Sequence, residues 1–179
     1  MAKLKGMKKL NKAILSEVQR FGIKKVDCEP EFSYAWKDEK IGYKVVVDET
    51  DNYFDEFVND RFDFPVEYDF IISILHEVGH RKTGDDIQGD LYDFCLAEKE
   101  RLFDLIALEA DEEKIKKYYF QYFNLPDEIM ATQWAVNYMK KHPRITKKMM
   151  KNMGDAIQDF YKINNVIDDE DLKEIAGVI

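Results

Sequence analysis

The stretch from Phe70 to His80 constrains the fold of this chain most, because an apolar run leads directly into the pattern H-E-x-x-H. Residues four apart lie on one face of an α-helix about one turn from each other, so His76 and His80 can direct both imidazoles at one ion. Glu77 follows the first histidine and is placed to accept a proton from a water molecule at that ion. The pattern therefore predicts a helix that carries two zinc ligands, His76 and His80, and a general base, Glu77.

Size and composition fit one folded domain. The chain has 179 residues, of which 45% are hydrophobic and 35% are charged, and this excludes a disordered chain. No apolar run is long enough to span a membrane, and the lysine-rich N-terminus lacks the continuous apolar segment of a signal peptide. Cys28 and Cys95 have no C-x-x-C spacing, which favours two reduced thiols. We therefore expect a cytoplasmic protein with a single domain, residues 1–179, in which residues 143–179 form a C-terminal helical extension.

The net charge of −9 argues against direct binding to nucleic acid, because affinity for the phosphate backbone depends on cationic contacts. One local exception is a basic cluster: Lys140, Lys141, Arg144, Lys147, Lys148 and Lys151. Such a cluster is usually a solvated helix face, although it could also face an acidic partner. We expect neither nucleic acid nor a membrane among the partners of this chain.

The N-terminal third predicts one helix followed by a small sheet. Apolar residues at helical spacing, with lysines between them, indicate an amphipathic helix from about residue 3 to residue 21. Three short runs rich in β-branched and aromatic residues then predict strands: Ile23 to Cys28, Phe32 to Trp36 and Tyr43 to Val47. The polar, glycine-ended connection 37–42 should join the last two strands as an antiparallel hairpin. An antiparallel sheet is therefore expected before the H-E-x-x-H helix.

Helices dominate the remainder of the chain. The motif helix should run from about Pro65 to Lys82, with Gly84 just past its end. Before it, residues 48–64 have no clear period and indicate a short helix or an ordered loop that could line a cleft. After it, helices are expected at residues 91–123 (broken once), 127–142, 145–163 and 168–175. The predicted fold class is thus α+β, mainly helical, with a small antiparallel sheet that precedes the H-E-x-x-H helix.

A third zinc ligand must come from another part of the chain, because catalytic zinc generally takes three protein ligands and leaves one position for water. Glu100, Glu109 and Glu128 lie in helical stretches and are the candidates. Glu100 is near the motif and is followed by Asp104, whereas Glu109 shares a helix face with leucine and isoleucine residues. Glu128 heads an otherwise apolar helix face, and a carboxylate buried there favours a neighbouring cation. These residues by themselves leave the choice among the three glutamates open.

Two segments together resemble a known family. Leu75 to His80, followed by Glu128 to Ala135, is similar to the ImmA/IrrE group of zinc metallopeptidases, which pair H-E-L-G-H with a later E-x-E-A-N-x-F-A helix. The matching positions in the second motif are Glu128, Ala131, Trp134 and Ala135. Thr132 stands where the family has Asn or Asp, and the segment between the motifs is long. The resemblance covers roughly residues 23–138 and implies a minimal zincin-like fold with Glu128 as the third ligand.

The resemblance also implies a function. It indicates a zinc-dependent metallopeptidase that hydrolyses a peptide bond in a protein or peptide substrate. The implied substrate is a helix-turn-helix transcriptional repressor, and such enzymes are often encoded on phages or mobile elements. The alternative is a catalytically silent, zinc-stabilised protein that binds a regulator without cleaving it. Glu77 favours the enzyme, because a purely structural zinc site needs no acid there and usually closes with four protein ligands.

A peptidase also requires a donor that stabilises the developing oxyanion. Tyr34 and Tyr43 lie in the predicted hairpin and are open candidates, although a strand tyrosine more often serves packing.

Overall fold

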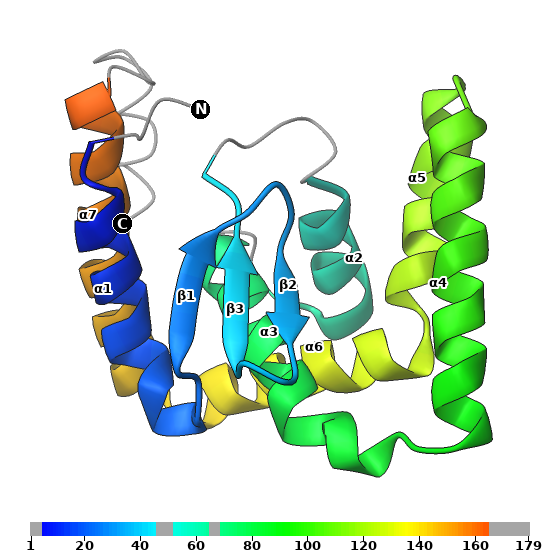
Figure 1. Ribbon diagram of the computed structural model, residues 1–179, viewed down its shortest axis with the longest axis horizontal. Helices are drawn as coiled ribbons and strands as arrows, with labels where there is room; N and C mark the ends of the chain where they lie inside the picture. The colour runs from blue at the N-terminus through cyan, green and yellow to red at the C-terminus, as the bar shows by residue number, and fades with distance from the viewer. Residues whose placement is uncertain (1–4, 46–51, 65–68, 165–179) are drawn as a thin grey trace.

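The computed structural model describes residues 5–45, 52–64 and 69–164, in which helices surround a small three-stranded sheet (Figure 1). The elements in chain order are α1 (Met7–Val18), the 3-10 helix η1 (Gln19–Phe21), β1 (Lys25–Cys28), β2 (Ser33–Ala35), β3 (Lys40–Tyr43), α2 (Asn52–Phe62), α3 (Asp69–Thr83), the 3-10 helix η4 (Gly84–Asp86), α4 (Asp90–Leu108), α5 (Glu112–Phe123), α6 (Pro126–Lys141) and α7 (Pro143–Asn164). The predicted α+β class, mainly helical with a small sheet before the H-E-x-x-H helix, is therefore confirmed.

The sheet is mixed, with the strand order β1-β3-β2. The predicted antiparallel hairpin is present, since β2 pairs antiparallel with β3 and places Tyr34 opposite Ile41. The prediction of an entirely antiparallel sheet was wrong, because β1 pairs parallel with β3 and places Val26 opposite the same Ile41. The reason lies in the strand order: the neighbour of β1 is β3 and not β2, and β3 runs opposite to β2 and in the same direction as β1. This central position fully buries Ile41 and Tyr43 of β3.

The third strand begins earlier than predicted, at Lys40 rather than at Tyr43. The turn before it is completed by Glu39, which adopts a left-handed φ of 46° without needing a glycine. Gly42, predicted to end the turn, lies inside the strand, where a side chain would press against Ser33 and Glu29. The predicted end of this strand falls within residues 46–51, outside the described residues.

The predicted helices are present wherever the chain is described. The acidic and aromatic stretch forms the helix α2, and the expected single break separates α4 from α5. Asp111 caps α5, since its carboxylate accepts hydrogen bonds from the backbone N–H groups of Glu113 and Lys114. The predicted start of the motif helix at Pro65 and the predicted helix at 168–175 lie outside the described residues.

The sheet and α3 form the centre of the molecule, with helix pairs at both ends (Figure 1). Helix α3 packs against β2 and β3 and along α6, whereas α1 and α7 lie side by side at one end, and α4 and α5 at the other. Met149 and Phe160 of α7 are buried in the same core as Leu10 and Ile14 of α1. The described part of the predicted C-terminal extension is thus packed against the first helix.

Within the described ranges, none of the helices has the length and apolar character needed to cross a membrane. Cys28 and Cys95 are both free thiols.

Candidate metal centre

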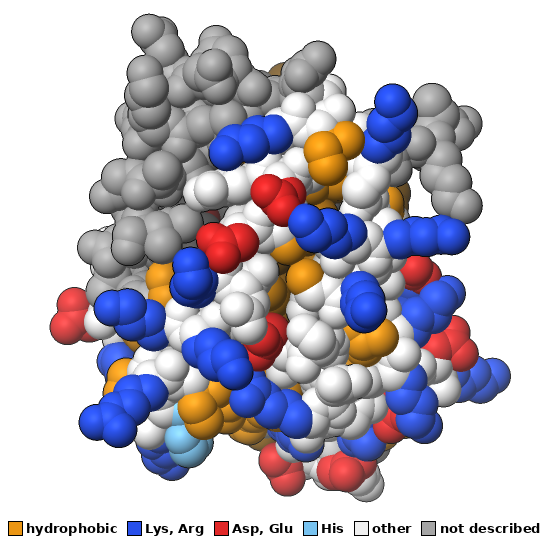
Figure 2. All heavy atoms as spheres, turned by 90° about the vertical axis from the view of Figure 1, so that its left-hand side faces the viewer, with side chains coloured by type: hydrophobic (Ala, Val, Ile, Leu, Met, Phe, Trp, Pro, Cys, Tyr) orange, Lys and Arg blue, Asp and Glu red, His pale blue; other side chains and the backbone are white. Residues whose placement is uncertain are grey.

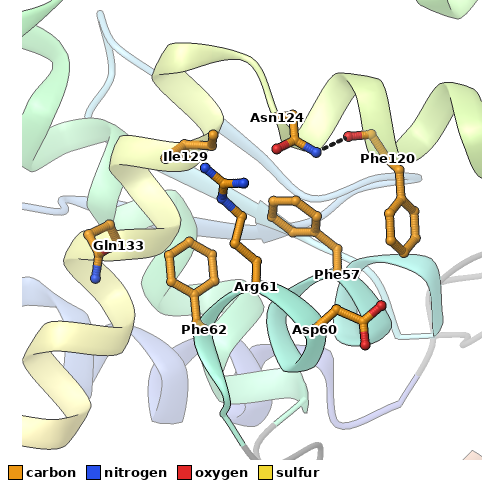
Figure 3. Close-up of a pocket in the computed structure, with 8 residues that line it drawn as sticks. All are labelled: Phe57, Asp60, Arg61, Phe62, Phe120, Asn124, Ile129 and Gln133. Atoms are coloured by element: carbon orange, nitrogen blue, oxygen red, sulfur yellow. Dashed lines mark hydrogen bonds between the residues drawn. The ribbon is translucent and has the colours of Figure 1, made fainter.

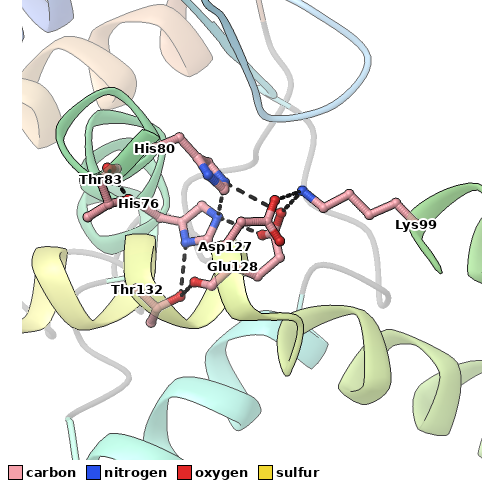
Figure 4. Close-up of polar contacts among 8 residues, drawn as sticks. His76, His80, Thr83, Lys99, Asp127, Glu128 and Thr132 are labelled. Carbon is pink, nitrogen blue, oxygen red and sulfur yellow. Dashed lines mark hydrogen bonds and ion pairs between the residues drawn. The ribbon is translucent and has the colours of Figure 1, made fainter. Parts of the chain in front are cut away.

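Helices α3 and α6 bring His76, His80 and Glu128 together (Figure 4). The two histidines stand one turn apart on α3, as their spacing predicts. Glu128 lies in the first turn of α6, which begins at Pro126, and the positive end of a helix dipole favours a carboxylate there. Of the three glutamates that the sequence left open, Glu128 is the one that the structure places beside the histidines.

The ligand atoms converge at distances that suit a small cation. The Nε2 atom of His76 lies 3.0 Å from Oε2 of Glu128 and 3.0 Å from Nε2 of His80. The Nε2 atom of His80 lies 3.5 Å from Oε1 of Glu128. Tetrahedral ligands held at about 2.0–2.1 Å from zinc stand roughly 3.3 Å apart, so these separations have the size of a zinc site. Two imidazoles and one carboxylate are also the ligand set of a known type of catalytic zinc centre.

Charge and burial point to a cation as well. Glu128 is 2% exposed, and Glu77 beside it in the cluster is 5% exposed. The carboxylates of Glu77, Asp127 and Glu128 face one ammonium group, that of Lys99. With neutral imidazoles and all three carboxylates ionised, two negative charges are left without a partner, and burying unpaired charge is expensive. A divalent cation would restore neutrality in this cluster.

The same proximity shifts the pKa values of the cluster. Burial raises the pKa of Glu77, and this effect exceeds the opposing influence of the neighbouring His76. Burial would also raise the pKa of Glu128, but His80 and His76 outweigh it and hold the pKa of that carboxyl well below its usual range. Glu128 is therefore ionised and available as a ligand, whereas Glu77 has the increased basicity that proton transfer requires.

Thr132 determines which nitrogen of His76 is free. Its hydroxyl group donates a hydrogen bond to the carbonyl oxygen of Glu128, over 2.8 Å. Because a hydroxyl has only one proton, the 2.9 Å contact between Thr132 Oγ1 and His76 Nδ1 requires the imidazole to be the donor. The proton of neutral His76 thus resides on Nδ1, and the lone pair of Nε2 points into the cluster. Thr132 thereby orients a metal ligand as an Asn or Asp side chain would.

Lys99 and Tyr122 also belong to this site, and sequence reasoning did not identify them. The Lys99 ammonium of α4 contacts both Glu128 and Asp127 (Figure 4) and lies 5.4 Å from the centre of the Tyr122 ring. Burial, together with Glu128 and Glu77, raises the pKa of Tyr122 well above its usual value, so its hydroxyl stays protonated. No local spacing links these residues to the motif, because the α4–α5 pair brings them to it through the tertiary fold.

The other sequence candidates lie elsewhere. Glu100 is exposed on α4. Glu109 follows the end of α4, where its carboxylate accepts hydrogen bonds from the N–H groups of Ala110 and Asp111, and these bonds lower its pKa. The hydroxyl of Tyr43 contacts Asn11 and Met7.

Helix α2 lines a groove, as the sequence suggested (Figure 3). This groove is separate from the cluster of His76, His80 and Glu128. Phe57, Asp60, Arg61 and Phe62 of α2 form one side, and residues of α5 and α6 form the other. None of the described lining residues belongs to the cluster. The same helix does contact the site through Phe54, whose ring lies 5.0 Å from the imidazole of His76 and edge-on to it.

Replacing Glu128 by glutamine should weaken zinc binding by more than about 100-fold, since even the partners that orient zinc ligands are worth about 10–100-fold. Matched Glu100→Gln and Glu109→Gln variants should bind zinc like the wild type, because neither carboxylate contacts the histidines. Competition with a fluorescent chelator measures all three affinities. Loss of zinc from Glu109→Gln together with retention in Glu128→Gln would contradict this ligand assignment.

Comparisons of the chain with protein-family models, with curated proteins and with solved structures found no match. The resemblance to the ImmA/IrrE group therefore rests on the two motifs alone. What the site does has to be argued from its own geometry.

Proposed function

We propose that this chain is a zinc-dependent metallopeptidase of the ImmA/IrrE type with a minimal zincin-like fold. The observation that carries the proposal is the convergence of His76, His80 and Glu128 directly beside the buried Glu77. A structural zinc site usually closes with four protein ligands, whereas three ligands and an adjacent base are the pattern of a hydrolytic centre. Among the described residues, this cluster offers three ligands of that kind.

The chain's own residues would divide the chemistry as follows. When bound, zinc polarises the scissile carbonyl group and lowers the pKa of water. Glu77 accepts a proton from the attacking water and later donates it to the leaving amine, a role that suits its raised pKa. His76 and His80 would hold the ion together with Glu128, and Thr132 keeps the Nε2 atom of His76 free and directed toward Glu128.

Tyr122 is the group best placed to donate a hydrogen bond to the oxyanion. Its hydroxyl lies close enough to Glu128 and Glu77 for both carboxylates to raise its pKa, so it retains its proton beside the reacting centre. Lys99 adds a positive charge in the same region. The two residues come from α5 and α4, so these helices complete the site that α3 and α6 begin.

An extended polypeptide is the substrate class that the fold favours. Strand β2 forms one edge of the sheet and lies against α3, so a substrate strand could pair with it and pass over the histidines. The family resemblance extends this proposal to a helix-turn-helix repressor. We place the activity in the cytoplasm, where free thiols such as those of Cys28 and Cys95 stay reduced.

The experiment is a cleavage assay with the zinc-loaded protein and a helix-turn-helix repressor encoded next to it, followed by mass spectrometry of the products. Defined fragments should appear, should disappear after removal of zinc with a chelator, and should return when zinc is added back. Stable binding of the repressor without cleavage would contradict the peptidase proposal.

One observation favours the alternative, a catalytically silent protein that binds a regulator. Lys99 contacts Glu128 and Asp127 directly, so the ligand cluster is already covered by a side chain on the α4 side. If this contact persists with zinc bound, it restricts access to the ion. Replacement of Lys99 by methionine would then increase the rate of cleavage, whereas an open site in the wild type predicts no increase.

A further inference from the structure

A basic surface covers the outer sides of α1 and α7, at the end of the molecule away from α4 and α5 (Figure 2). Residues 5–21 and 143–164 contain 10 of the chain's 27 Lys and Arg residues but only 3 of its 36 Asp and Glu residues. The rest of the chain therefore holds 17 basic and 33 acidic residues. The net charge of −9 thus conceals a strong separation of positive from negative charge.

The three acidic residues in these segments are already engaged. Glu17 is buried and accepts a hydrogen bond from Asn152, whereas Asp159 pairs with Lys9 and Asp155 with Lys151. Arg20 approaches Glu17. Seven exposed cations remain that form no ion pair with any residue the structure describes, and we call them the basic face: Lys5, Lys8, Lys12, Arg144, Lys147, Lys148 and Lys162.

The helices hold the basic face in a regular arrangement. The cations of α7 lie opposite its buried side, which includes Met149, Met153 and Phe160. From Arg144 to Lys162 they extend over about 27 Å at 1.5 Å per residue, which approaches the roughly 34 Å of one DNA turn. Helix α1 runs antiparallel beside α7, as shown by the hydrogen bonds from Lys5 to Asn164 and from Asn152 to Glu17, and adds its lysines to the same surface.

We propose that the basic face binds the phosphate backbone of double-stranded nucleic acid. Six of its seven cations are lysines, which act as point charges on phosphates, whereas the planar fork of arginine is the group that best suits bidentate contacts. The exposed large apolar residues in these two helices are Ile145 and Ile163, and neither is an aromatic platform on which single-stranded bases stack. The face therefore recognises charge and shape, without a preferred sequence.

Other polyanions fit this surface less well. A helix that lies on a membrane inserts its apolar side, but the apolar sides of α1 and α7 are buried in the core of the protein. The centre of a protein–protein interface is usually depleted of lysine, whereas lysines make up most of the basic face. The binding of nucleic acid is also independent of the proposed peptidase activity.

The test measures the affinity of the full chain for a fluorescein-labelled DNA duplex of 24 base pairs, by fluorescence anisotropy at several salt concentrations. The wild type should bind with a Kd of about 10⁻⁴–10⁻⁶ M near physiological salt, and more tightly at low salt. The triple variant Arg144→Gln, Lys147→Gln, Lys148→Gln should lose roughly tenfold or more in affinity, and its slope of log K against log salt should be shallower by about 2–3. The matched variant Lys37→Gln, Lys82→Gln, Lys117→Gln removes the same charge from exposed positions elsewhere and should stay within about twofold of the wild type.

Three results would overturn the proposal. The first is no binding of the wild type to DNA at 50 mM salt, and the second is an equal loss of affinity in both triple variants. The third is tighter binding to vesicles that contain phosphatidylserine than to the duplex. Parallel measurements with an RNA duplex of the same length distinguish the two nucleic acids, and either one would support the proposal, since both present the same phosphate chemistry.

Discussion

Replacing Glu77 by glutamine should reduce peptide hydrolysis by about 10³-fold, because a positioned general base contributes about 10²–10⁴-fold to rate. Glutamine keeps the size of the side chain but cannot accept the proton. Glu77 is not one of the three residues whose ligand atoms converge, so the variant should still bind one equivalent of zinc. Burial raises the pKa of Glu77, which shows that its ionised form is disfavoured there, so removing the charge should leave the melting temperature unchanged or higher.

Three measurements on the same preparation separate catalysis from structure: the cleavage rate, the zinc content and the melting temperature. Glu100→Gln is the matched control, because it makes the same chemical change at an exposed position of α4. A variant that loses activity and zinc together would show that Glu77 supports the metal rather than the proton transfer. Full activity in Glu77→Gln would exclude Glu77 as the base.

The part of the site that the sequence predicted depends on local geometry. His76 and His80 are four residues apart on one helix, and this spacing brings them together whatever surrounds the helix. The assignment of Glu128 could not follow from spacing along the chain, because its distance from the histidines depends on how α6 crosses α3. Its place at the head of an apolar helix face favoured it, but the residues alone left Glu100 and Glu109 open, and it was the resemblance to the ImmA/IrrE group that implied Glu128.

Features that arise from packing between distant elements could not be predicted in this way. Lys99 and Tyr122 reach the cluster because α4 and α5 pack beside each other and against α6, and nothing in their sequence neighbourhoods indicates that arrangement. The parallel pairing of β1 with β3 has the same origin. The basic face is in part a further example. The sequence indicated the cluster around Lys147, but the joining of these cations to the lysines of the first helix depends on how α1 and α7 pack.

Replacing Gly79 by alanine should destabilise the protein by about 2 kcal/mol. Forced overpacking in a core costs up to about 3 kcal/mol, and the preference of a helix for alanine over glycine offsets about 1 kcal/mol of that cost. Gly79 lies where the backbones of α3 and α6 are in close contact. A Cβ atom there would lie 2.8 Å from both the Cα and the carbonyl carbon of Ala131, and closer still to its oxygen. These are backbone atoms, so no side chain can rotate away and the two helices must separate.

Separation of α3 from α6 should also weaken the metal centre, because Gly79 directly precedes His80, and Ala131 lies about one turn after Glu128. Urea unfolding of the metal-free protein measures the loss of stability, and chelator competition measures the loss of zinc affinity. Because the obstruction is the backbone of Ala131 and not its methyl group, adding Ala131→Gly to Gly79→Ala should not restore either property. An alanine variant as stable as the wild type would show that the helices tolerate a wider crossing. Coupled losses of stability and zinc affinity would instead show that the crossing which closes the core also sets the distance between Glu128 and the histidines.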